Sequence, residues 1–335
     1  MCKLKKSMHF VTVVSLILNM FFVCFVFNCG ACMSDGDTSK KILAKQSSPN
    51  DFIVDEKGCL TGYNGYAETV VIPETVKSIY FGVFMEKPEI KAVFFPEELI
   101  CVDEYAFYGC TGIHEIILPE SVEKVSRLAF GACKNIEFMY VGKNVKSWGE
   151  FALLGCKGLS YVSVNEENPN YAVFDGVLYD KNYNKLICCP SGRSGDIDIH
   201  ENTVTINSYA FFECDKIEKI TASNNLKYID EAAFCGCRNL SLVNFGEGIK
   251  KIRAACFEDC ESLKEFTVGS NVSLVGSVAF FDCPSFSKIT FLNPDTKIGK
   301  KIFSRNQKVV ICGYIGSTAE KYAEKYGYEF KDVKC

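Results

Sequence analysis

One short phrase returns through the chain at a fixed interval and constrains the fold more than any other feature. The phrase is an Ala-Phe pair, or a close variant, followed by a cysteine three residues after the phenylalanine, as in Ala106-Phe107-Tyr-Gly-Cys110. Its copies begin at Ala106, Ala129, Ala152, Ala210, Ala233, Cys256 and Ala279, and the step within each of the two runs is 23 residues. The same step reaches Val83-Phe84 and Ile302-Phe303. A constant period of about 20 to 50 residues is typical of a solenoid, in which each repeat forms one coil.

Each repeat contains two short apolar segments before the Ala-Phe pair returns. In the segment Ile113-His-Glu-Ile116-Ile-Leu118-Pro119, apolar residues alternate with others and a proline ends the run, which predicts a strand with one buried face. Val122 and Val125 form the second apolar pair. A single coil cannot bury such a face, so we expect coils to stack and to align equivalent side chains in columns.

Two such columns are predicted from the repeated phrase. The aromatic members are expected to form one continuous column of Phe84, Phe107, Phe130, Phe211, Phe234, Phe257, Phe280 and Phe303. The cysteines Cys110, Cys133, Cys156, Cys214, Cys237, Cys260 and Cys283 are expected to face inward as a second column. Buried free cysteine behaves as a small apolar residue, which favours a space-filling role. Disulfides are the alternative if the chain is exported from the reducing cytoplasm. The 23-residue spacing is not that of a structural zinc site.

An insertion separates the two runs of the repeat. The step from Ala152 to Ala210 is 58 residues, and the excess lies at about residues 165–195. Within it, Asp175-Gly176 stands between two apolar runs, which is a strong signal for a β-hairpin. The hairpin is either a protruding contact element or an insertion tolerated at a surface turn.

The C-terminal segment has the pattern of an amphipathic helix. Apolar residues at Ala319, Tyr322, Ala323 and Tyr326 share one helical face, and Ser317 precedes them as a candidate N-cap. Gly327 supplies a stop signal. We expect this helix to cover the last coil as a cap.

The aligned copies give a consensus close to Val-x-x-Ile-x-x-x-Ala-Phe-x-x-Cys-x-x-Leu-x-x-Ile-x-Leu-Pro. This consensus resembles the BspA-type leucine-rich repeat over about residues 52–330. The resemblance implies a mainly β, leucine-rich-repeat solenoid of 23-residue coils, here with a β-hairpin insertion and a C-terminal capping helix. It also implies a secreted or surface protein of a family associated with adhesion and with binding host or matrix proteins.

The first 32 residues do not follow the repeat. Three lysines precede an apolar run from Phe10 to Phe27, which is typical of a secretory signal peptide or an N-terminal anchor. The sequence Cys29-Gly-Ala-Cys32 resembles a bacterial lipoprotein cleavage site, with Cys32 as the lipidated residue. Lipidation at Cys32, simple cleavage near Ala31 and an uncleaved membrane anchor all remain open, and each places the rest of the chain outside the cytoplasm. Residues 33–51 are predicted to be a flexible tether.

The sequence gives little support for catalysis. It contains three histidines, and neither His114 nor His200 has a fixed partner of the kind used in acid-base chemistry. Recognisable phosphate-binding, hydrolase or zinc-protease motifs are absent. A net charge of −4 gives no reason to expect nucleic acid. We therefore expect no enzyme activity, no cofactor, no metal site and no small-molecule substrate.

Binding residues are expected on the outward positions of the predicted strands, because these positions have no role in the core. One outward column contains Ala92, Glu115, Phe138, Tyr161, Lys219, Leu242, Glu265 and Lys288, and the other contains Phe94, Ile117, Tyr140, Ser163, Thr221, Asn244, Thr267 and Thr290. Apolar and aromatic residues gather before the insertion: Phe94, Ile117, Phe138, Tyr140 and Tyr161. Exposed aromatic clusters often mark contact surfaces. These five residues are the predicted protein-binding site, unless the hairpin or a cap folds over them.

The most consistent interpretation is a non-enzymatic adhesion or binding protein, secreted or tethered to the membrane through its N-terminal segment. Its partner is expected to be a protein, with host or matrix proteins implied by the resemblance. The alternative is a structural or scaffold component of the cell's own envelope.

Overall fold

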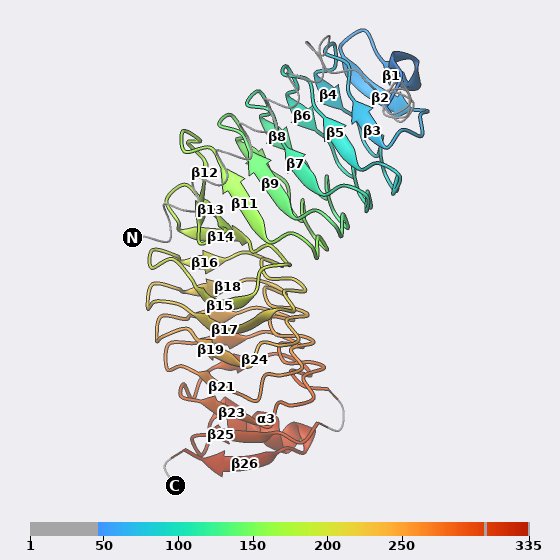
Figure 1. Ribbon diagram of the computed structural model, residues 1–335. Coiled ribbons are helices and arrows are strands. Elements are labelled where there is room, and N and C mark those ends of the chain that lie inside the picture. Colours follow the sequence, from blue (N-terminus) through green and yellow to red (C-terminus); the bar gives the residue numbers. More distant parts are fainter. Residues whose placement is uncertain (1–45, 305–306, 334–335) are drawn as a thin grey trace. The chain divides into compact units, whose positions relative to one another are not determined.

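Two rows of parallel strands enclose the core of the molecule (Figure 1). The computed structural model describes residues 46–304 and 307–333, and the folded unit begins at Ser47. The long-strand row consists of β3 (Thr69–Val71), β5 (Ala92–Phe94), β7 (Glu115–Ile117), β9 (Phe138–Val141), β11 (Tyr161–Val164), β15 (Gly195–Asp198), β17 (Ile217–Thr221), β19 (Leu242–Asn244), β21 (Glu265–Val268), β23 (Lys288–Phe291), β25 (Val310–Gly313) and β26 (Glu329–Asp332). The short-strand row consists of β2 (Cys59–Tyr63), β4 (Ser78–Ile79), β6 (Cys101–Val102), β8 (Lys124–Val125), β10 (Ser147–Trp148), β14 (Lys185–Cys188), β16 (Thr205–Ile206), β18 (Tyr228–Ile229), β20 (Lys251–Ile252), β22 (Leu274–Val275) and β24 (Lys297–Ile298).

The strand register reproduces the sequence period. Ile79 pairs with Val102, and Val102 pairs with Val125, so partners in neighbouring coils are 23 residues apart. Within each strand, alternate side chains enter the core: Ile116 is buried, whereas Glu115 and Ile117 on either side of it are exposed. The predicted mainly β solenoid of 23-residue coils is confirmed.

Each coil turns through a corner, the segment that carries the Ala-Phe pair. The residue before the alanine has a positive φ, for example 57° at Tyr105. Such a conformation costs about 1–3 kcal/mol for a residue other than glycine, so surrounding contacts must hold it. Hydrogen bonds along the solenoid do so. Tyr105, Phe107 and Gly109 donate their backbone N–H groups to carbonyls of the next corner, and the bond from Phe107 to Ala129 is 2.8 Å long.

The core phenylalanines form two stacks and not the single column predicted from the sequence. Phe84, Phe107 and Phe130 stack with ring centroids 4.8 and 5.4 Å apart. The second stack contains Phe211, Phe234, Phe257, Phe280 and Phe303. The two stacks belong to separate clusters of buried residues, the N-terminal and the C-terminal core cluster. The insertion lies between the clusters, which explains why the column is divided.

The insertion is a hairpin, as predicted. Strand β12 (Tyr171–Phe174) pairs with β13 (Val177–Asp180) in antiparallel register. The turn residues Asp175 and Gly176 both have positive φ, as a two-residue type I′ turn requires. Strand β13 then pairs with β14, which returns to the parallel short-strand row. Both rows are interrupted at this level, because β10 and β11 are the edge strands of their sheets. We call this level the seam.

Caps close both ends of the described solenoid. At the N-terminal end a 3-10 helix, η1 (Pro49–Asp51), leads into β1 (Phe52–Val54), which pairs with β2 in antiparallel register. At the other end, helix α3 (Thr318–Tyr326) has Ser317 as its N-cap and Gly327, with φ 76°, as its C-cap. The hydroxyl of Tyr322 on α3 accepts a hydrogen bond from the N–H of Ile302 at 2.9 Å. The predicted C-terminal capping helix is confirmed.

The N-terminal predictions fall largely outside the described residues. The signal or anchor segment and the candidate lipidation residue Cys32 lie in residues 1–45. The N–H of Ser47 bonds to the carbonyl of Thr69 at 2.9 Å, so residues 47–51, placed with the tether from the sequence, contact the solenoid. The exact extent of the tether stays a prediction. In the described part of the chain, no helix has the length and apolar character needed to cross a membrane.

Candidate functional site

The five predicted binding residues lie together on the outward face of the long-strand row. Phe138 of β9 is paired with Glu115 of β7 on one side and with Tyr161 of β11 on the other. Tyr140 is paired with Ile117, and Phe94 lies on the preceding strand, β5. We call Phe94, Ile117, Phe138, Tyr140 and Tyr161 the sheet-face patch.

The patch is only partly open to solvent. Ile117 and Phe94 are the most exposed members, with 43% and 37% of their surface accessible. Phe138, Tyr140 and Tyr161 are half-buried. The rings of Phe138 and Tyr161 stack with centroids 6.2 Å apart, so these two side chains support each other across the strands.

Tyr140 differs from the other members because a polar network holds its hydroxyl. The hydroxyl donates to Glu120 Oε1 at 2.6 Å, and Asn165 Nδ2 donates to the Tyr140 hydroxyl and to Glu120 Oε1, both at 3.0 Å. Burial and the neighbouring Glu120 carboxylate raise the pKa of Tyr140 to about 12. Burial alone would raise the pKa of Glu120, but hydrogen bonds from the Lys143 N–H, Tyr140 and Asn165 outweigh it and lower that pKa. The hydroxyl of Tyr140 therefore joins three successive coils.

The hairpin reaches the patch at one residue. A side chain added at Gly176 would come within 3.4 Å of Cδ2 of Tyr161, so the hairpin turn lies against that ring. An ion pair between Arg193 and Asp175 holds the turn, with 2.5 Å between Nη2 and Oδ2. Beyond the seam, the outward positions are mostly polar or charged, with Leu242 as an exposed apolar exception.

The structure contains a second aromatic surface that was not predicted from the sequence. It runs along the corners of successive coils and contains Phe81, Tyr105, Arg127, Phe151, Tyr209 and Phe212, which we call the corner ridge. Ring centroids of Phe81 and Tyr105 are 5.4 Å apart, and those of Phe151 and Tyr209 are 4.9 Å apart. Arg127 joins the two pairs, because its guanidinium lies 6.0 Å from the Tyr105 ring and 5.5 Å from the Phe151 ring. The available signal was that aromatic residues precede the alanine of the phrase at 105, 151 and 209.

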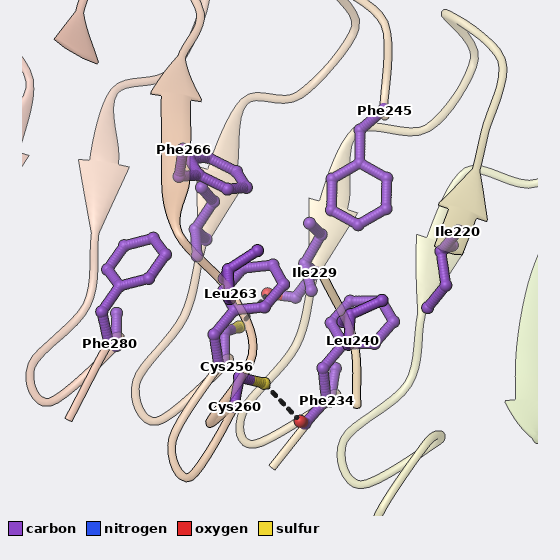
Figure 2. Close-up of a cluster of buried hydrophobic side chains, with 14 of the residues drawn as sticks. Ile220, Ile229, Phe234, Leu240, Phe245, Cys256, Cys260, Leu263, Phe266 and Phe280 are labelled. Atoms are coloured by element: carbon purple, nitrogen blue, oxygen red, sulfur yellow. Dashed lines mark hydrogen bonds between the residues drawn. The ribbon is translucent and has the colours of Figure 1, made fainter. Parts of the chain in front are cut away.

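The repeated cysteines are buried free thiols with a defined partner. Cys110 Sγ donates to the carbonyl of Phe84 at 2.9 Å, and Cys133 Sγ donates to that of Phe107 at 3.0 Å. Figure 2 shows the same contact between Cys260 and Phe234 in the C-terminal core cluster. Burial raises the pKa of Cys110 to about 12. The thiol thus fills space, as predicted, and also ties each corner to the preceding coil.

The two histidines of the described solenoid have different neighbours, an exposed carboxylate and an aromatic ring. His114 faces Glu137 at 3.7 Å, with both side chains exposed. His200 stacks on Tyr183 with ring centroids 4.1 Å apart, and its Nδ1 accepts from the N–H of Asn202. Across residues 46–304 and 307–333, no group of three or more His, Cys, Asp or Glu side chains is placed to hold a metal ion.

Comparison with known proteins agrees with the fold. The family model described as "BspA type Leucine rich repeat region" matches residues 62–176 and 189–310 in six copies. Similar solved structures include the pneumococcal vaccine antigen PcpA, at 20% identity and a TM-score of 0.64 over 85% of this chain and 83% of that one. A leucine-rich cell surface protein of Faecalibacterium prausnitzii is 18% identical, with a TM-score of 0.51 over 84% and 97%. A leucine-rich repeat protein of Eubacterium ventriosum is 20% identical, with a TM-score of 0.57 over 69% and 68%. No curated protein matches the sequence significantly.

Proposed function

This chain belongs to the family of BspA-type leucine-rich repeat proteins, and from that premise we propose that it is a non-enzymatic binding protein of the cell surface. In this proposal the sheet-face patch contacts a protein partner. The N-terminal segment exports the solenoid and keeps it attached to the membrane, with lipidation at Cys32 as the means of attachment. The same fold in a protein described as a leucine-rich cell surface protein is consistent with this location.

The observation that carries the proposal is the unequal distribution of apolar residues along the long-strand row. Strands β5, β7, β9 and β11 present Phe94, Ile117, Phe138 and Tyr161 outward, although the core does not need them there. Protein interfaces are enriched in aromatic residues surrounded by a polar rim. Glu115 and Glu137 are exposed next to this patch, so we expect a partner with an apolar centre and basic residues around it.

The test compares two double variants of the full chain. Ile117→Ser with Phe138→Ser removes two patch side chains without touching the Tyr140 network. Leu242→Ser with Glu265→Ser is the matched control, because these residues occupy outward positions beyond the seam. Host matrix proteins and the cell's own envelope proteins are captured separately on each immobilised chain, and the bound partner is quantified.

We expect the patch variant to lose at least about tenfold in affinity, since truncating a central interface residue commonly costs more than about 1 kcal/mol. The control should bind like the wild type, and both variants should keep the wild-type circular dichroism spectrum. Unchanged capture by the patch variant would contradict the proposal. A partner found only among envelope proteins would assign the chain to a scaffolding role.

A further inference from the structure

The corners carry a ladder of backbone hydrogen bonds that repeats from coil to coil. In one corner the backbone N–H groups of three residues, spaced two apart, donate to the carbonyls of three residues with the same spacing in the next corner. Phe84 donates to Ala106 at 2.8 Å, Phe130 to Ala152 at 3.0 Å and Phe234 to Cys256 at 2.8 Å, and each of these bonds has one companion on either side. The ladder therefore has a direction, because every corner offers its N–H groups toward the C-terminal end of the solenoid.

At the seam this ladder stops. The corner of residues 149–156 still accepts the three bonds of the preceding corner, including that from Ala132 to the carbonyl of Leu154 at 2.7 Å. Its own donors are Phe151, Leu153 and Gly155. Within the described part of the chain, these three N–H groups form no hydrogen bond. Across the seam lie residues 187–189 and Ser191, at the end of β14 and directly after it, which do not repeat the regular corner. Unsatisfied backbone donors away from bulk water are unfavourable, so they favour any ligand that provides acceptors.

A cavity opens beside two of these donors, Phe151 and Leu153. It has a volume of about 250 Å³ and is lined on one side by residues 148–154. Residues 187–189, Ser191, residues 207–209 and Phe212 line the other side, with Asp230 at its edge. The rings of Phe151 and Tyr209 meet edge to face within it, and the rings of Tyr209 and Phe212 are 5.8 Å apart. We call this cavity the corner slot. It shares no lining residue with the sheet-face patch.

We propose that the corner slot binds a short peptide segment of a partner protein, which docks as the corner that the insertion displaced. Alternate carbonyls of the peptide accept hydrogen bonds from the N–H groups of Phe151, Leu153 and Gly155. An apolar side chain of the peptide packs against Phe151, Tyr209 and Phe212.

The spacing of the donors identifies the class of ligand. In the regular corners, donors at positions i, i+2 and i+4 are satisfied by carbonyls at equally alternate positions of another chain segment. A polypeptide backbone can present the carbonyl of every second residue along one edge, as it does when a peptide adds to the edge of a sheet. A phosphate or carboxylate concentrates its oxygens at one point and matches at most part of the row. The aromatic walls of the slot also suit an apolar side chain better than an isolated anion.

The direct test is hydrogen exchange at the three amides in the full chain. The probe is an acetylated and amidated peptide with the sequence of residues 103–109, Asp-Glu-Tyr-Ala-Phe-Tyr-Gly, which carries a regular set of corner carbonyls. Without the peptide, the amides of Phe151, Leu153 and Gly155 should exchange quickly, whereas the amide of Phe130 should exchange slowly. Saturating peptide should slow exchange at the three amides at least tenfold.

Slow exchange before peptide is added would overturn the proposal, because it would show that the donors already have acceptors. No slowing at saturating peptide would overturn it too. Inorganic phosphate serves as a parallel probe, and slowing by phosphate but not by the peptide would assign the slot to an anion.

Two variants test the position of the peptide by fluorescence anisotropy of a labelled probe. Ser208→Trp places an indole in the slot from an exposed position, and Glu104→Trp is the control at the equivalent position of a regular corner. Phe151→Gly removes one aromatic wall while relaxing a φ of 61°, and Val278→Gly makes the same relaxation at φ 53° in a regular corner far along the chain. Both slot variants should bind the probe at least tenfold more weakly than the wild type. The control variants should bind the probe with wild-type affinity. Wild-type affinity in either slot variant would contradict the proposal.

Discussion

Single residues in the corner serve more than one purpose. The phenylalanine of each phrase stacks on its neighbours, its carbonyl accepts a hydrogen bond from a cysteine one coil further on, and its N–H donates to the next coil. Phe107 illustrates this, since it lies between Phe84 and Phe130, accepts from Cys133 Sγ at 3.0 Å and donates to Ala129. The repetition of the phrase follows from this combination, because replacing either residue would disturb two coils.

Cysteine reactivity provides a test at this scale. Burial raises the pKa of Cys110, Cys156 and Cys283 to about 12, from an ordinary value of 9.0. At pH 8 these thiols contain about a thousandfold less thiolate than an ordinary cysteine, and the thiolate is the nucleophile. Iodoacetamide at pH 8 should therefore modify the partly exposed Cys59 and leave the three buried thiols intact, as counted by peptide mass spectrometry.

Raising the pH to 9.5 should not label the three buried cysteines, because their thiols still titrate at higher pH. Adding urea at pH 8 should label all of them, since unfolding removes the burial that raises their pKa. Labelling of Cys110, Cys156 or Cys283 in the native chain would show that the corner opens far more often than its contacts imply.

At the scale of elements, close approach between coils determines which positions must be glycine. A Cβ atom added at Gly248 would lie 1.9 Å from the carbonyl oxygen of Asn224 in the preceding coil, whereas one added at Gly269 would meet no atom within 4 Å. Neither glycine has a positive φ, so the difference between them is purely one of space. The two positions thus form a matched pair for measuring how tightly coils pack.

Gly248→Ala should destabilise the solenoid by about 1–3 kcal/mol, the usual cost of forcing an extra group into a packed site. Gly269→Ala should change stability by less than about 0.5 kcal/mol. Urea unfolding followed by circular dichroism measures both. Equal effects of the two substitutions would mean that the coils separate without strain.

The sequence predicts those elements whose signal is local or periodic. The constant step identified the coils, Asp175-Gly176 identified the hairpin turn, and Ser317 with Gly327 bounded the capping helix. The same reasoning failed where structure depends on how the insertion meets the coils. The division of the phenylalanine column, the contact of Gly176 with Tyr161 and the bonding of Tyr140 to Glu120 and Asn165 all join segments that no repeat aligns. The position of the sheet-face patch on the sheet was therefore predicted, but the partial burial of its side chains was not.

At the scale of the whole solenoid, the seam divides the core into two clusters. Strand β13 contributes to both, because Leu178 belongs to the N-terminal core cluster whereas Val177 and Tyr179 belong to the C-terminal one. Within a cluster the phenylalanine rings stack from coil to coil, whereas contacts that cross the seam away from β13, such as the Phe151–Tyr209 ring pair and the Lys157–Glu213 ion pair, lie outside the two stacks. Substitutions on opposite sides of the seam are thus expected to act independently.

A double-mutant cycle tests this independence. Phe130→Ala and Phe257→Ala should each cost about 3–5 kcal/mol, because each empties a fully buried site. Their combined effect should equal the sum to within about 0.5 kcal/mol, whereas Phe107→Ala and Phe130→Ala, whose rings stack, should deviate by more. Global fits to urea unfolding curves give these values. A large coupling between Phe130 and Phe257 would show that the seam transmits packing as well as a regular coil does.

The seam also has a mechanical consequence. Every regular junction is joined at its corner by a row of backbone hydrogen bonds, and the junction after Gly155 has none within the described residues. A force can be applied to the molecule by holding its two ends and pulling them apart in a single-molecule experiment. Under such tension the molecule should yield first at this junction, extending in one step while both stacked halves stay folded. The insertion would then extend at a lower force than the two stacked segments and so limit the force that reaches them.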